Sequence, residues 1–150
     1  MSKSISITIT LEKHNLKQIK TMKIIQALIK YGWTLYHNGY INYQPLGSED
    51  WVVNILDLKS LAGILTAKEA NREIIGIMMK WRLSDTGGDF LFWPEEGTYE
   101  AFSLSVNPFR PEITLADNYE VTDFQWYLEK LLPPLNDLFG VKSFLCEEHR

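Results

Sequence analysis

The sequence predicts an α+β domain in which about three helices pack on a largely antiparallel sheet. Three observations support this class. Residues 5–11 alternate between apolar and polar side chains, as in a half-buried strand. Asn38-Gly39 lies between two strand-like segments and indicates a tight hairpin. Residues 124–132 carry one apolar stripe at helical spacing. The chain has 150 residues, of which 45% are hydrophobic, and shows no linker or repeat, so we expect a single domain spanning 1–150.

After the first strand, the spacing of apolar residues along the chain changes, and this new spacing predicts the next elements. Apolar residues recur at steps of three and four over 15–31, which predicts a helix that ends at Gly32. Residues 33–37 and 40–43 flank the Asn-Gly pair and should be the two strands of the hairpin.

The next two segments are a short strand and a helical stretch. Residues 51–56 are a candidate strand, and 57–71 have a helical pattern. Thr66 is followed three residues later by Glu69, which would form a capping box and split this stretch into two short helices.

The middle of the chain predicts three strands. Residues 73–83 place alternate apolar side chains on one face; a helix continuing from residue 67 is the competing interpretation. We favour the strand because a turn at 85–88 follows and 90–93 is a suitable partner strand. A further strand is expected at 102–106, and 113–115 is a candidate short edge strand.

The last helix has the clearest boundaries. Thr122 is a suitable N-cap and Gln125 would complete a capping box with it. Pro133-Pro134 is expected to end the helix, because neither proline has an N–H group to donate. Residues 141–146 are a candidate final strand.

The charge of the chain is unevenly distributed. The net charge is -4, but residues 1–83 carry a net +5 and residues 84–150 a net -9. The pattern could reflect acids in solvated loops, or it could form a negative surface that attracts a basic partner. An acidic protein of this kind is a poor binder of nucleic acid, because neutralising phosphates requires Lys and Arg.

The composition also bears on compartment. The single cysteine, Cys146, cannot form a disulfide within the monomer and fits a reducing cytosol. No apolar run reaches the roughly 18 residues needed to cross a bilayer, and the alternating first ten residues do not resemble a signal peptide. We therefore expect a cytoplasmic protein with no membrane partner.

No motif for catalysis or metal binding emerges. His14, His37 and His149 are too far apart for ligand spacing, and no nucleophile or phosphate-binding motif occurs, so no catalytic residue, metal or cofactor is predicted. Asp85-Thr86-Gly87 matches the tripeptide of aspartic proteases, but it has no second copy and is interpreted as part of a hairpin turn. Cys146 is expected to be an inert thiol.

Two segments carry a resemblance to a known class of protein. They are Gly87-Gly88-Asp89-Phe90-Leu91-Phe92-Trp93-Pro94 and the helix Thr122 to Pro133. Together, over roughly residues 73–134, they resemble bacterial immunity proteins of contact-dependent growth inhibition and other polymorphic toxin systems. The resemblance implies a non-enzymatic inhibitor that binds a cognate toxin domain, often a nuclease, and occludes its active site.

The resemblance and the charge pattern converge on one hypothesis. A nuclease needs a basic cleft for phosphates, so a compact acidic surface could occupy that cleft. The candidate toxin-binding residues are the acids of the second half: Asp85, Asp89, Glu95, Glu96, Glu100, Glu112, Asp117 and Glu120. Two alternatives stay open: a small cytosolic enzyme with an unrecognised site, for which Asp85, His37 and Asp89 are the first candidates, and an adaptor or structural protein.

Overall fold

The alternation on the first strand sets the two faces of the main sheet. In the computed structural model, which describes residues 4–12, 19–94 and 99–150, the odd-numbered side chains of β1 (Ser4–Leu11) are buried and the even-numbered ones lie on the opposite face. Nine strands form this sheet, in the order β11-β1-β8-β7-β6-β4-β3, with β2 paired to β6 and β5 paired to β4. All of the recorded pairings are antiparallel, so the predicted α+β class is confirmed.

The elements run along the chain as follows. The strands are β1, β2 (Trp33–Thr34), β3 (Tyr36–His37), β4 (Tyr40–Tyr43), β5 (Val52–Asn54), β6 (Ile75–Trp81), β7 (Gly87–Phe92), β8 (Ala101–Val106), β9 (Glu112–Thr114), β10 (Glu120–Thr122) and β11 (Val141–His149). The helices are α1 (Thr21–Tyr31), α2 (Leu58–Ala70) and α3 (Phe124–Phe139), with a 3-10 turn at Ala116–Asn118.

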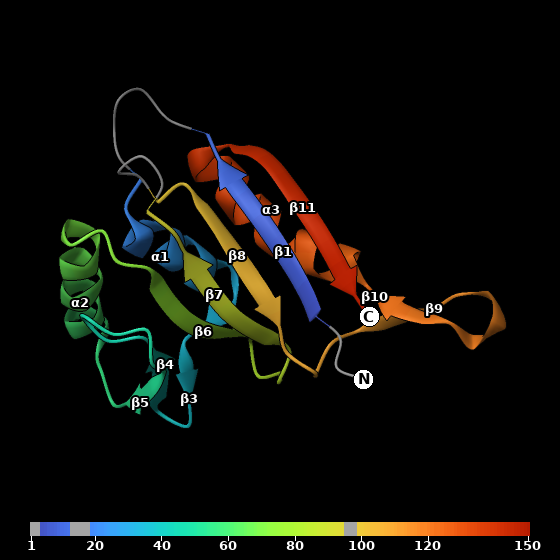
Figure 1. The fold of residues 1–150 in the computed structure, drawn as a ribbon, viewed down its shortest axis with the longest axis horizontal. Coiled ribbons are helices and arrows are strands. Elements are labelled where there is room, and N and C mark those ends of the chain that lie inside the picture. The colour runs from blue at the N-terminus through green and yellow to red at the C-terminus, as the bar shows by residue number, and fades with distance from the viewer. Residues whose placement is uncertain (1–3, 13–18, 95–98) are drawn as a thin grey trace.

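One face of the sheet forms the core. In Figure 1, α1 and α3 lie behind the sheet and cover this face, while the opposite face is uncovered by helices. Cross-strand partners on the inner face continue from strand to strand, because Ile9 pairs with Phe102, Phe102 with Phe92, and Phe92 with Ile75. All four side chains are fully buried, and the rings of Phe92 and Phe102 stack with centroids 4.9 Å apart.

The uncovered face, which we call the open face, has a different composition. β1 and β8 place small polar side chains there, with Ser6 opposite Ser105 and Thr8 opposite Ser103. β7 contributes Asp89, whose cross-strand partners are Met78 on β6 and Ser105 on β8. Because successive side chains of a strand point to opposite faces, one face of the sheet is aliphatic and aromatic and the other is rich in hydroxyl groups.

The predicted hairpin is confirmed, with a break in its first strand. Asn38 and Gly39 both have positive φ, 52° and 84°, as a type I′ turn requires. The expected strand 33–37 is divided at Leu35, because β2 pairs with β6 whereas β3 pairs with β4. The chain therefore changes its strand partner within the predicted span.

Two expectations about the first helices are wrong. α2 is one continuous helix that begins at its N-cap Asp57, whose carboxylate accepts from Ser60 N at 2.7 Å. Thr66 does not cap a second helix; its hydroxyl donates back to the carbonyl of Ala62 within the same helix. Glu69 instead accepts a 2.8 Å bond from the backbone N–H of Thr21, the first residue of α1.

The first helix is also shorter than its apolar period suggests. Of the predicted span 15–31, residues 15–18 lie outside the described part of the chain, and residues 19 and 20 precede the helix. The carboxylate from α2 supplies the partner for a free N–H group at the helix start, so a contact between two helices determines where α1 begins.

The strand predicted within 73–83 is confirmed as β6. The next strand, β7, begins with two adjacent glycines whose positions leave no room for a side chain. A Cβ atom on Gly87 would collide with the main-chain oxygen of Met79, and one on Gly88 with that of Ser105. Glycines are therefore required where β7 passes between β6 and β8.

The last helix differs from expectation at both ends. Its N-cap is Asp123, which accepts from Trp126 N, whereas Thr122 ends β10 and donates to Glu148 on β11. Gln125 completes no capping box; it bonds Glu129.

The two prolines do not end α3, which continues through Pro133 and Pro134 to Phe139. The helix persists because side chains of Tyr31 and Trp33 bond the main-chain oxygens that the prolines cannot pair.

Candidate functional site

The predicted acidic residues divide between the two ends of the sheet. Asp85 lies in the β6–β7 turn, and its main-chain oxygen accepts from Asn107 at the end of β8, 2.9 Å away. The segment after Asn107 leads into β9 and β10, so Glu112, Asp117 and Glu120 belong to the same end. Glu100 precedes β8 at the opposite end, where its main-chain oxygen accepts from Leu11. The predicted residues therefore do not all form one surface.

The three remaining candidates are Asp89, Glu95 and Glu96. Asp89 lies in the middle of the open face, and its partial burial raises the pKa of its carboxyl group. Glu95 and Glu96 lie outside the described residues.

Several carboxylates at the shared end are paired within the chain. Glu112 lies 4.0 Å from Arg110, and Glu148 accepts from Arg150 at 2.8 Å. Lys80 lies 3.8 Å from Asp85. The negative field of this end is therefore weaker than the count of acids in the sequence suggests.

The clearest feature of this end is a protruding arm, defined here as residues 112–122. β9 and β10 pair only with each other in the described structure, rather than adding 113–115 as an edge strand to the main sheet. Figure 1 shows the arm extending away from the sheet beside the C-terminal end of β11. Residues 112–120 are all exposed, including Ile113, Leu115 and Tyr119, each of which leaves about half of its surface in solvent.

The arm is attached to the body at its base. Thr122 donates from its hydroxyl and its N–H to the carboxylate of Glu148, at 2.5 and 3.0 Å. Arg150 donates to the main-chain oxygen of Glu120 and lies over the ring of Tyr119, 4.2 Å from its centroid. Two consecutive residues near the tip, Asp117 and Asn118, adopt left-handed φ values of 61° and 59°.

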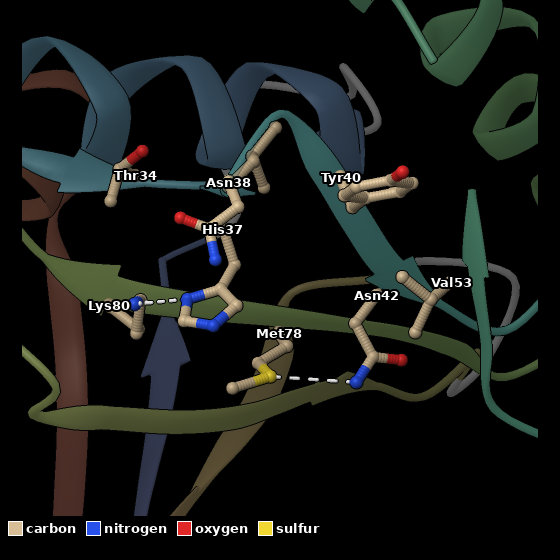
Figure 2. A pocket seen from close by; sticks show the side chains of 9 residues that line it. Thr34, His37, Asn38, Tyr40, Asn42, Val53, Met78 and Lys80 are labelled. Atoms are coloured by element: carbon tan, nitrogen blue, oxygen red, sulfur yellow. Dashed lines mark hydrogen bonds between the residues drawn. The ribbon is translucent and has the colours of Figure 1, made fainter. Parts of the chain in front are cut away.

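A pocket forms on the open face between the β3–β4 hairpin, β5 and β6. It encloses about 260 Å³. Its walls include the apolar side chains of Val53 and Met78 and the ring of Tyr40. Figure 2 shows the imidazole of His37 extending into this space between Lys80 and Met78, with Asn42 opposite.

The polar side of the pocket is a short chain of three residues. Lys80 Nζ lies 2.6 Å from His37 Nδ1 and 3.8 Å from Asp85 Oδ1. Lysine has no acceptor, so Nδ1 accepts this bond and the neutral imidazole carries its proton on Nε2. The structure thus brings His37 and Asp85, two of the candidates for an enzyme site, to the same lysine. Asp89 does not line the pocket. It is the cross-strand partner of Met78, which does.

Lys80, Met78 and Asn42 are site residues that the sequence analysis did not identify. The alternation of β6 places Met78 and Lys80 on the face opposite Ile77 and Met79, which is the only local signal that they carry. The hairpin meets that face through strand pairing, which no local pattern encodes.

The described residues contain another unusual lysine, Lys68 on α2, which has no exposed surface. Its ammonium donates to the carbonyl oxygens of Gln44 and Pro45, at 3.1 and 2.9 Å, and lies 3.6 Å from a carboxylate oxygen of Glu73. Burial lowers the pKa of this lysine, and Glu73 opposes the shift. Because its donors are used by the chain, Lys68 has a structural role.

Three further observations concern thiol reactivity, metal binding and helices that could cross a membrane. Burial raises the pKa of the Cys146 thiol, which disfavours the reactive thiolate. Among the described residues, no three His, Cys, Asp or Glu side chains are grouped to hold a metal ion. None of the helices in that same part of the chain is long and apolar enough to cross a membrane.

Comparison with known proteins returned no relative: no family model, curated protein or solved structure matches this chain.

Proposed function

We propose that this protein is an immunity protein that binds a basic toxin domain in the cytoplasm and occludes the active site of that toxin. The observation that carries the proposal is the arm. A two-stranded hairpin is marginally stable by itself in water, and this one exposes three large apolar side chains along its length. Apolar groups projecting from a protein body are typical of surfaces that become buried in a complex.

The chemistry of the arm fits a cationic partner. Asp117 and Glu120 lie among the exposed apolar side chains of Leu115 and Tyr119. Tyrosine is enriched at protein interfaces, where it contributes contact area and a hydroxyl group. An apolar strip bordered by carboxylates would enter a phosphate-binding cleft and place negative charge against its lysines and arginines. The resemblance of residues 73–134 to immunity proteins supports the same function.

The test uses the toxin domain that the proposal expects to be encoded beside this gene, co-expressed with this chain in a bacterial host. The native chain should restore growth. Leu115→Arg together with Tyr119→Arg should abolish protection, because the arm would then repel a basic cleft. The control is Leu46→Arg, which changes a leucine of similar exposure, 49% against 51%, in a loop beside α2. Equal protection by the arm variant and the control would exclude the arm as the toxin-binding element, and failure of the native chain to protect would refute the proposed function.

A further inference from the structure

The pocket on the open face contains a cation whose pairing is incomplete. The side chain of Lys80 is only 13% exposed, whereas the side chain of Asp85 is 67% exposed and its oxygen lies 3.8 Å away, beyond hydrogen-bond distance. An ammonium has three N–H donors, and His37 is the one hydrogen-bond acceptor that the described residues supply. Lys80 therefore retains donors for an additional anion.

The opposite side of the pocket is suited to an apolar group. Val53 and Met78 provide an aliphatic and thioether surface, and the ring of Tyr40 borders it. Binding pockets for drug-sized ligands are typically about 300–1,000 Å³. A volume of about 260 Å³ accordingly selects a smaller molecule.

A second polar group at the pocket is also poorly satisfied. Asn42 donates from its amide nitrogen to the sulfur of Met78 at 3.5 Å, and sulfur is a weak acceptor. Its amide oxygen is buried and has no hydrogen-bond partner among the described residues. Buried polar atoms without partners are costly. An amide oxygen only accepts, so it would pair with a donor on the body of a ligand and not with an anionic group.

We propose that this pocket binds a small organic anion, namely a carboxylate attached to a flat apolar body. The carboxylate would accept from Lys80 Nζ and from the Nε2–H of His37, and the body would pack between Met78, Val53 and Tyr40. The pocket is made by residues of β2 to β6, whereas the arm is made by β9 and β10, so this binding site is separate from the proposed toxin-binding element.

The experiment compares three nearly isosteric probes of different charge: benzoate, benzamide and benzamidinium. Protein carrying ¹³C-methyl methionine is titrated with each probe, and the methyl signal of Met78 reports on the pocket. Benzoate should shift this signal with a dissociation constant of about 1–10 mM, as expected for so small a ligand. Benzamide should bind about tenfold more weakly, because it lacks a charge-assisted hydrogen bond, and benzamidinium weaker still.

Four variants test whether the carboxylate binds to Lys80 inside this pocket. Lys80→Met should remove the preference for benzoate over benzamide, whereas Lys59→Met, at an exposed position of α2, should leave it unchanged. Asp85→Asn should tighten benzoate binding, because it removes a competing anion. Val53→Trp keeps Lys80 but fills the pocket, and should weaken binding of every probe.

Three results would overturn the proposal. The first is an equal shift of the Met78 signal by all three probes, and the second is no shift by benzoate. The third is an unchanged preference for benzoate in Lys80→Met. If Lys80→Met does not fold, Asp85→Asn and Val53→Trp decide: unchanged benzoate affinity in both would exclude the site.

Discussion

The indole N–H of Trp33 donates a 2.9 Å hydrogen bond to the main-chain carbonyl oxygen of Lys130. In an uninterrupted helix this oxygen would accept from the residue four positions later, which is Pro134 and has no N–H. The oxygen of Glu129, four residues before Pro133, is similarly 3.5 Å from the hydroxyl of Tyr31. The end of α1 and strand β2 therefore replace the two hydrogen bonds that the prolines remove from α3.

This replacement predicts an energetic coupling between Trp33 and Pro134. Trp33→Phe should destabilise the native chain by about 2–4 kcal/mol, since it loses both the hydrogen bond and buried volume. In a Pro134→Ala background, the alanine N–H can bond Lys130, and the cost of Trp33→Phe should fall by about 1 kcal/mol. Urea unfolding of the four proteins measures the coupling. Phe90→Leu, which alters a ring in contact with Trp33, is the control and should add to Pro134→Ala without coupling.

The buried ammonium of Lys68 should be essential for stability. Lys68→Met keeps most of the apolar volume but leaves the carbonyl oxygens of Gln44 and Pro45 without their donor, so we expect a loss of about 2–4 kcal/mol. Lys59→Met on the same helix is exposed and should change stability by less than about 0.5 kcal/mol. Chemical denaturation compares them, and equal midpoints would show that the carbonyl contacts contribute nothing.

The burial pattern of α3 predicts unequal costs for two leucines of its apolar stripe. Leu131 has no exposed surface, whereas Leu128 is only partly buried against the core. Leu131→Ala should cost about 2–5 kcal/mol and Leu128→Ala clearly less. The difference in denaturation midpoints tests this order, and a larger loss for Leu128→Ala would contradict the described packing.

Removal of the hydroxyl group from two buried tyrosines should affect the stability of the chain differently at neutral pH. Tyr99 donates to the carbonyl oxygen of Glu73 at 2.7 Å, so Tyr99→Phe should destabilise by about 1–2 kcal/mol. The hydroxyl of Tyr127 is buried without a partner among the described residues, and Tyr127→Phe should be neutral or stabilising. Thermal unfolding at pH 7 distinguishes the two, and a large loss in Tyr127→Phe would reveal a partner for that hydroxyl.

Tyr99→Phe should also differ from the native chain in alkali. Burial raises the pKa of Tyr99 from 10.0 to about 12. The folded chain therefore keeps a proton that the unfolded chain loses, and this stabilisation is complete below pH 10 and lost as the pH rises to 12. Tyr99→Phe should consequently lose less stability than the native chain across this interval, and parallel curves would contradict the assigned pKa.

Asp89 should contribute negatively to stability at neutral pH. Its burial raises the pKa of the carboxyl group above 3.8, so the folded state binds the proton more tightly than the unfolded state does. Stability is thus lost as the pH rises through the raised pKa. Asp89→Asn should unfold at a higher temperature than the native chain at pH 7, with the difference shrinking below pH 3.8.

The control for this prediction is Asp85→Asn, at an exposed turn, which should alter stability little. If Asp89→Asn also weakens inhibition of the toxin, Asp89 belongs to the interface. Its carboxylate would then destabilise the folded chain but contribute to binding of the toxin. Unchanged inhibition would remove Asp89 from the candidate toxin-binding residues.

Local patterns were sufficient for the fold class and most of its elements. The alternation at 5–11 and 73–83, the Asn38-Gly39 turn and the stripe at 124–132 each report which side of an element is buried, and that information lies within a few residues of sequence. β1, β6, the β3–β4 hairpin and the body of α3 follow from these patterns.

What only the tertiary structure decided depends on groups far apart in the chain. The start of α1 depends on Glu69, the passage of α3 through its prolines on Tyr31 and Trp33, and the pocket on a hairpin that brings His37 to Lys80. The acids of the second half were evident in the sequence, but their division between two ends of the sheet and their pairing with Arg110, Arg150 and Lys80 were not. A hydrogen bond or ion pair acts only over a few ångströms, so it cannot be inferred until the fold has placed its two partners together.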